Sequence, residues 1–138
     1  MHLILYISVI TTVTMKITIL NFCLVLFAAI GLAQENVREL GLLPEAVFET
    51  SGLIYYNHKF ITHNDSGNTA QLFELDTTSL QITRTIDIAN AVNIDWEDIA
   101  QDDTYIYIGE IGNNNGSRRD LAIYRILKTE YDLSDSVF

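Results

Sequence analysis

A repeated pattern of short strands between residues 49 and 127 constrains the fold more than any other feature. The runs SGLIYY, KFITHN, AQLFELD and LQITRTIDI are short and rich in β-forming residues, and turn clusters such as Asp65-Ser66-Gly67-Asn68 separate them. Four such runs within about 40 residues predict an antiparallel meander. No convincing helical period interrupts the pattern.

The pattern then begins again with EDIAQ, TYIYIGEI and LAIYRIL. The turn that starts at Asp65 aligns with Glu110-Ile111-Gly112-Asn113 at an offset of 45, and Glu49 aligns with Glu97 at an offset of 48. A repeat of about 45 residues with four strands per unit is typical of β-propeller blades. We therefore expect an all-β fold with two four-stranded meanders, blade one at about 49–92 and blade two at about 93–138.

The second unit is expected to be incomplete. It lacks a clear fourth strand, and the final LSDSVF reads as an outer strand that breaks off. A six-bladed propeller needs about 270 residues, so we expect the chain to be the N-terminal fragment of such a protein. We do not expect an oligomer. Assembly of three short chains into one ring stays open as the alternative.

Residues 1–33 contain no acidic residue and one basic residue, Lys16. From Met15 the chain has a basic start, an apolar stretch and small residues that end at Ala33, which is the layout of a secretory signal peptide. We expect initiation at Met15 and cleavage near Ala33, with 1–14 as an upstream extension and 34–48 as a lead-in segment. The expected location is secreted or periplasmic. An uncleaved membrane anchor is the alternative, although Lys16 interrupts the apolar run.

The charge excludes several classes of partner. The chain carries 18 acidic and 8 basic side chains, a net charge of −10. Nucleic acid backbones and anionic membrane surfaces would be repelled, so a membrane could be reached only through an uncleaved N-terminal segment. Cations and basic surfaces are the natural partners. The only cysteine, Cys23, lies in the apolar stretch, so the mature chain is expected to have no disulfide.

The acidic residues are placed so that they converge. In a meander, the residue before the first strand and the residue after the second lie at the same edge of the sheet. Carboxylate and amide oxygens are the ligands of Ca²⁺, whereas the lack of cysteine and the few histidines disfavour zinc or copper. The predicted cation site consists of Glu49, Asn64, Asp65, Asp95, Glu97, Glu110 and Asn113. In the alternative interpretation these residues only shape turns.

Three further residues have two interpretations each. His63, at the end of a strand, could act as a general base or have a hydrogen-bonded structural role. Trp96 is expected to be a packing anchor between the repeats rather than a platform for a substrate. Arg118 belongs either to a solvated loop or to a site for an anionic ligand.

The segments ETSGL, THNDSGN, NIDWEDIA and YIGEIGNN, followed by RDLAIYRI, resemble a family of secreted bacterial β-propeller proteins. That family is similar to the six-bladed gluconolactonase-like (senescence-marker), NHL-repeat and esterase-like phytase proteins. The resemblance covers 49–127. It implies a metal-ligand role for Glu49, and Glu110 stands where aspartate is commoner.

Together these patterns predict an exported acidic β-propeller fragment that binds a small molecule or a protein at its acidic face. It is expected to hold a divalent cation, with Ca²⁺ as the candidate, at the mouth of the central channel of the propeller. The alternative is a metal-dependent hydrolase of the lactonase or phosphoester type. There Glu49, Asp65, Asp95 and Glu97 would hold the metal, which would activate water or polarise an ester oxygen.

Overall fold

The computed structural model describes residues 15, 16, 18 and 37–138. The predicted signal peptide, its start at Met15 and its cleavage near Ala33 therefore fall almost entirely outside the described residues. The chain divides between Glu39 and Leu40, and residues 40–138 form one compact unit. All the strands of the described residues lie within residues 40–138. Among the described residues, no helix is both long and apolar enough to cross a membrane.

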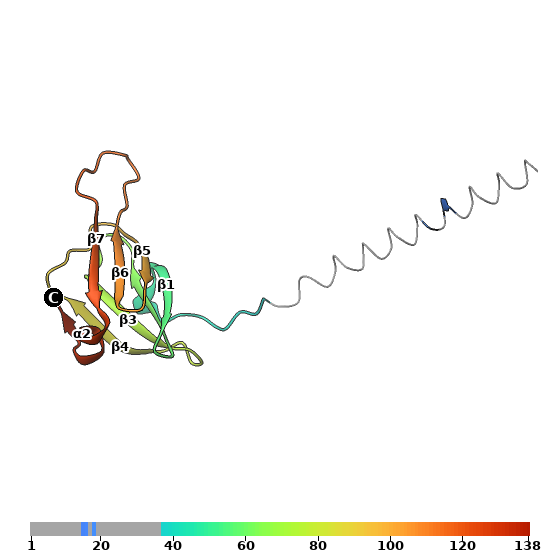
Figure 1. Ribbon diagram of the computed structural model, residues 1–138, viewed down its shortest axis with the longest axis horizontal. Coiled ribbons are helices and arrows are strands. Elements are labelled where there is room, and N and C mark those ends of the chain that lie inside the picture. Colours follow the sequence, from blue (N-terminus) through green and yellow to red (C-terminus); the bar gives the residue numbers. More distant parts are fainter. Residues whose placement is uncertain (1–14, 17, 19–36) are drawn as a thin grey trace, which may run out of the picture. The chain divides into compact units, whose positions relative to one another are not determined.

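The first sheet contains the predicted meander. Its antiparallel strands are β1 (Thr50–Tyr56), β2 (Lys59–Asn64), β3 (Gln71–Asp76) and β4 (Ile82–Ile88) (Figure 1). The turn between β1 and β2 has positive φ at both Asn57 and His58, which matches the twist of a two-residue hairpin. A short 3-10 helix, η2 (Glu45–Val47), precedes β1 and buries Val47.

The second sheet has three antiparallel strands: β5 (Trp96–Gln101), β6 (Tyr105–Glu110) and β7 (Ala122–Leu127). A long loop, residues 111–121, joins β6 to β7 and projects from the end of the sheet (Figure 1). The prediction of a mainly β fold with two successive antiparallel sheets is confirmed. In the described part of the chain the two sheets do not form a closed propeller.

The C-terminal segment differs from the prediction. It forms a short helix, α2 (Lys128–Leu133), and a strand, β8 (Ser136–Val137), which pairs in parallel with β4 at the edge of the first sheet. The sequence placed LSDSVF in blade two, whereas its strand β8 pairs with the first sheet. The cause is Arg84 on β4, whose guanidinium donates to the carbonyl oxygens of Tyr131 and Ser134 at 2.6 and 2.5 Å.

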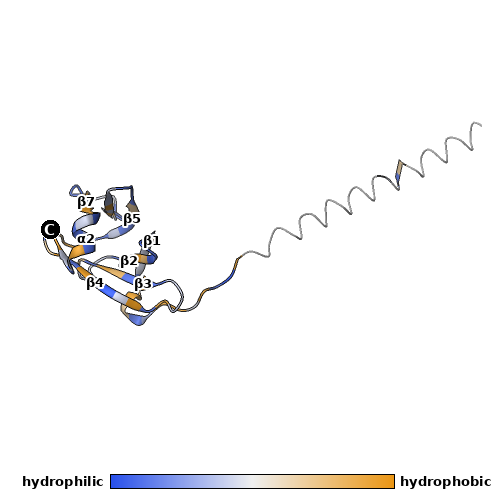
Figure 2. Ribbon diagram, turned by 60° about the horizontal axis from the view of Figure 1, so that its bottom comes forward, coloured by the Kyte–Doolittle hydropathy of each residue, from blue (hydrophilic) through white to orange (hydrophobic). Residues whose placement is uncertain are grey.

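The two sheets pack against each other through β1 and β5. The hydroxyl of Ser51 donates to the carbonyl oxygen of Glu97 at 2.9 Å, and Gly52 lies so close to β5 that a β-carbon there would be 2.8 Å from the Ile99 nitrogen. Trp96 is fully buried in the core between the sheets, which agrees with its expected packing role. Apolar and polar residues alternate along the strands in Figure 2.

The first two strands of each sheet share one pairing register, with an offset of 46 in residue number. Thr50 pairs with Asn64 in the first sheet as Trp96 pairs with Glu110 in the second, and Ile54 pairs with Ile61 as Ala100 pairs with Tyr107. Glu110 therefore corresponds to Asn64, whereas the sequence alignment had matched it to Asp65. A shift of one residue exchanges the two faces of a strand, so Glu110 faces inward.

Candidate metal site

Three carboxylates, which we call the acidic triad, meet at one end of the two sheets: Asp65, Asp95 and Glu97. Oxygen atoms of the three side chains lie within 4.8 Å of one another, and all three residues are half-buried. Asp65 directly follows β2, and Asp95 lies in the loop before β5. Glu97 is the extra residue of a β-bulge in β5, between the paired residues Trp96 and Asp98. A bulge re-aims its side chain, and here the triad includes the bulged residue.

The triad has few internal partners. One oxygen of Asp65 accepts a hydrogen bond from the Ser66 amide at 2.6 Å, and the described residues provide no hydrogen bond to the carboxylates of Asp95 and Glu97. The ion pairs of the described residues involve other acids, namely Glu74, Asp76, Glu110, Asp120 and Asp135. Three carboxylates thus lie together without a basic side chain among residues 37–138 to compensate them.

Asn93 fixes the backbone on both sides of the triad. Its amide nitrogen donates to the carbonyl oxygens of Asn64 and Asp65 at 2.9 and 2.8 Å, and its amide oxygen accepts from the Trp96 amide at 3.1 Å. Because Asn93 is buried, these bonds are shielded from water. Asn93 therefore ties the end of β2 to the start of β5, which are the two places that supply the triad.

Glu110 holds the backbone of the Asp95 loop instead of joining the triad. Its carboxylate accepts hydrogen bonds from the amides of Ile94 and Asp95 at 2.8 and 3.0 Å, and from Arg118 at 2.6 Å. Glu110 is fully buried. Hydrogen bonds from Arg118 to Asp120 and to Glu110 raise the pKa of the Arg118 guanidinium. Arg118 thus lies in the projecting loop, and its half-buried side chain pairs with Glu110 and Asp120.

The other predicted ligands make hydrogen bonds of their own. Glu49 is exposed, and its carboxylate accepts a hydrogen bond from Asn68 at 2.7 Å. The Asn64 side-chain amide donates to the carbonyl oxygen of Ala46 at 2.9 Å, and its buried oxygen has no protein partner. The side-chain oxygen of Asn113 accepts from the Arg118 amide at 2.9 Å and so shapes the loop after β6.

His63 lies inside the protein, where a substrate has no access. The ring is fully buried, its Nδ1 is 3.0 Å from the carbonyl oxygen of Asn64, and its edge contacts Trp96 with ring centroids 5.5 Å apart. His58, the other histidine in the described residues, is exposed in the turn between β1 and β2. This geometry favours the structural interpretation of His63.

Gly112 is the residue at this site whose role the sequence pattern missed. Its φ is not in the left-handed region, yet a β-carbon at this position would lie 2.0 Å from the carboxylate carbon of Asp95. The amide of Gly112 also donates to the Asp95 carbonyl oxygen at 3.0 Å. Glycine is therefore needed here to leave room for the Asp95 carboxylate. The Gly-Asn spacing after β6 suggested only a turn.

Comparisons with protein-family models, with curated proteins and with solved structures found no match to this chain.

Proposed function

We propose that this protein is a divalent-cation-binding β-repeat module in which the acidic triad holds Ca²⁺ where the two sheets meet. The observation that carries the proposal is the convergence of Asp65, Asp95 and Glu97 within 4.8 Å without a basic partner among residues 37–138. Three negative charges at this separation repel one another. A divalent cation turns that repulsion into attraction, and carboxylate oxygens are the ligands that Ca²⁺ prefers.

The bound ion would act as a clamp. Asp65 is supplied by the end of the first sheet, and Asp95 and Glu97 by the start of the second. An ion held by all three carboxylates connects the two sheets at the end where Asn93 and Glu110 already fix the backbone. Because the ion binds the folded chain and not the unfolded chain, its binding free energy adds to stability. Water supplies the remaining ligands of an ion that takes six to eight oxygens.

The wider proposal places this module in an exported propeller of the type that the sequence resembles. The strand register repeats between the two sheets, and the acidic residues gather at one end, as expected for blades around a channel mouth. The net charge of −10 supports a cationic, small-molecule or protein ligand at that end and opposes nucleic acid. No observation favours the hydrolase alternative, because neither described histidine faces the triad from solvent.

Calorimetric titration with CaCl₂ tests the proposal. The chain starting at Gln34 is used, because residues 40–138 form a compact unit. We expect saturable binding of one ion, and at least a tenfold loss of affinity in Asp95→Asn and in Glu97→Gln. Asp103→Asn is the matched control, since Asp103 is an exposed acid outside the triad. Equal binding by the control and both triad variants would refute the assignment.

A further inference from the structure

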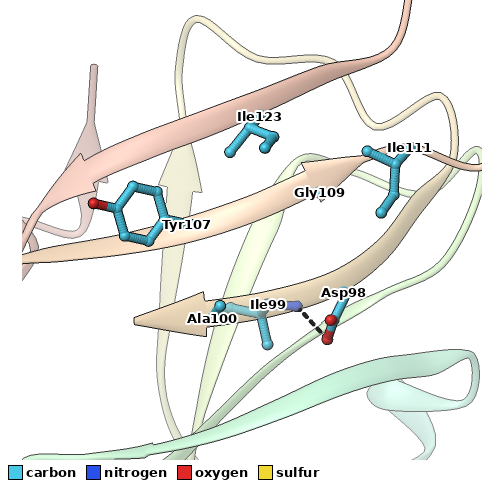
Figure 3. Close-up of a pocket in the computed structure, with 7 residues that line it drawn as sticks. All are labelled: Asp98, Ile99, Ala100, Tyr107, Gly109, Ile111 and Ile123. Carbon is cyan, nitrogen blue, oxygen red and sulfur yellow. Dashed lines mark hydrogen bonds between the residues drawn. The ribbon is translucent and has the colours of Figure 1, made fainter. Parts of the chain in front are cut away.

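The outer face of the second sheet carries an uncovered apolar hollow of about 160 Å³. Figure 3 shows the residues around the hollow, which come from β5, β6 and β7 and from the loop after β6. The lining residues are Asp98, Ile99, Ala100, Tyr107, Gly109, Ile111 and Ile123. The Ile123 side chain is 70% exposed and that of Ile111 is 45% exposed. Two exposed isoleucines thus lie next to one hollow on this face.

The register shared by the two sheets shows what such a face packs against. At the offset of 46, Ala100, Tyr107 and Gly109 occupy the positions of Ile54, Ile61 and His63. In the first sheet, Ile61 and His63 are fully buried because the second sheet covers them. The hollow is therefore the repeat equivalent of a face that already packs on a sheet inside this chain.

The third strand of each sheet extends the same correspondence. Ile61 pairs with Glu74 as Tyr107 pairs with Arg125, so Leu72 in β3 corresponds to Ile123 in β7. Leu72 is fully buried between the sheets, whereas Ile123 is mostly exposed. Leu72 belongs to the core between the two sheets, whereas Ile123 lines the open hollow.

A complementary face is exposed on β1, on the side of the first sheet that points away from the second. There Leu53 and Tyr55 are 57% and 55% exposed, and Phe48 just before the strand is exposed as well. Leu53 has the register position of Ile99, the residue of β5 that packs on Gly52. At β1 and β5 the chain thus exposes the equivalents of the two surfaces that meet internally, while Thr62 and Leu75 on the same face of the first sheet are buried.

We propose that the hollow on the second sheet binds the exposed β1 face of a second copy of this chain, head to tail. This contact repeats the way in which the second sheet packs on the first within one chain. It places Leu53 of one copy in the hollow between Tyr107 and Ile123 of the next copy. An assembly of two copies still has one free hollow at one end and one free β1 face at the other. Further copies can therefore add until a ring closes or an open filament forms. This departs from the expectation that the chain does not oligomerise.

The net charge of the chain gives this association a distinctive salt dependence. Copies with a net charge of −10 repel each other at long range, whereas the two faces are mainly apolar. Within the hollow, the carboxylate of Asp98 already accepts a hydrogen bond from the Ile99 amide at 2.8 Å (Figure 3). Added salt screens the repulsion and leaves the apolar contact in place, so association strengthens as ionic strength rises.

Sedimentation velocity over a range of concentrations tests the proposal on the chain starting at Gln34. We expect species of three or more copies, favoured by salt. The variant Ile123→Asp blocks the hollow, and Leu53→Asp blocks the β1 face. Each residue is exposed in a single chain, so both variants keep the fold, which circular dichroism checks. Each variant alone is expected to be monomeric, and an equimolar mixture is expected to form a one-to-one dimer, because only one intact pair of faces remains.

Controls make the outcome decisive. Leu133→Asp removes an exposed apolar side chain outside both faces and should assemble like the unmodified chain, while Ile111→Asp should repeat the effect of Ile123→Asp. An unmodified chain that stays monomeric at every concentration overturns the proposal. So does a mixture of the two blocked variants that remains monomeric while the unmodified chain assembles, since an intact hollow and an intact β1 face would then have failed to bind each other.

Discussion

The carboxylate of Asp95 occupies the space that a side chain at Gly112 would fill. A β-carbon built on Gly112 would lie 2.0 Å from both the carboxylate carbon and one oxygen of Asp95. The backbone of Gly112 is compatible with other residues, because its φ is not positive. The Asp95 carboxylate, in the loop before β5, therefore fits against the backbone of Gly112 in the loop after β6.

The Gly112→Ala variant should weaken calcium binding. The added methyl group displaces the Asp95 carboxylate from its position beside Asp65 and Glu97, and we expect a loss of affinity of about tenfold, equivalent to about 1.4 kcal/mol. Titration calorimetry measures the change. The control is Ser117→Ala in the same loop, at an exposed position without backbone strain. If both variants bind Ca²⁺ equally well, the contact does not position the ligand.

The Gly52→Ala variant should destabilise the packing of the two sheets. Gly52 has a φ of 66°, and a β-carbon would lie 2.8 Å from the Ile99 nitrogen. We expect a loss of about 2–4 kcal/mol, the sum of about 1 kcal/mol of backbone strain and about 1–3 kcal/mol of overpacking. Urea denaturation measures it. Gly67→Ala separates the two effects, because Gly67 has a φ of 75° with open space around it, so only the strain should appear. Equal losses would show that β1 and β5 are not in close contact.

The first meander was predictable from sequence because its signals are local. Alternating apolar residues and turn clusters predicted β1 to β4, and the acidic residues before and after strands predicted that Asp65, Asp95 and Glu97 would gather at one end. The role of Glu110 was not predictable. Its orientation depends on strand register, and a difference of one residue turned an expected ligand into a buried anchor.

The C-terminal segment shows the same limit. The helix α2 is short, and the place of β8 is determined by Arg84, which is more than 40 residues away in the chain. Neither hydrophobic period nor turn residues report on such a contact. Gly112 was likewise recognisable as a turn residue, but its close approach to Asp95 is a property of the folded chain.

The Glu110→Ala variant should lower stability by about 1–3 kcal/mol, the usual cost of leaving buried hydrogen-bond donors without their acceptor. The substitution leaves Arg118 and the amides of Ile94 and Asp95 without their acceptor. Chemical denaturation measures the loss, and Glu130→Ala, at an exposed position of α2, should change stability little. A loss below 1 kcal/mol for Glu110→Ala would mean that water replaces these bonds.

Acid should destabilise the protein through Asp76. Hydrogen bonds from the amides of Ser79 and Thr78, and from the Lys59 ammonium, hold the pKa of this carboxyl well below its ordinary value of 3.8. The unfolded chain therefore binds the proton more readily. The contribution of Asp76 is fully present above pH 3.8 and is lost as the pH falls through the lowered pKa.

Urea midpoints measured from pH 6 down to pH 2 check this dependence. Asp76→Asn should show a shallower loss of stability below pH 4 than the unmodified chain, because one group with a lowered pKa has been removed. Asp103→Asn, an exposed acid in the turn before β6, should keep the original slope. An Asp76→Asn profile parallel to that of the unmodified chain would contradict the assignment.

The most direct test of the cation site is a crystal of the chain grown in CaCl₂, with the anomalous difference density measured at a long wavelength where calcium scatters anomalously. We predict a single strong peak at the acidic triad, with oxygens of Asp65, Asp95 and Glu97 at about 2.3–2.6 Å from it. A triad without anomalous density at saturating calcium, its three carboxylates apart or hydrogen-bonded only to water, would contradict the account.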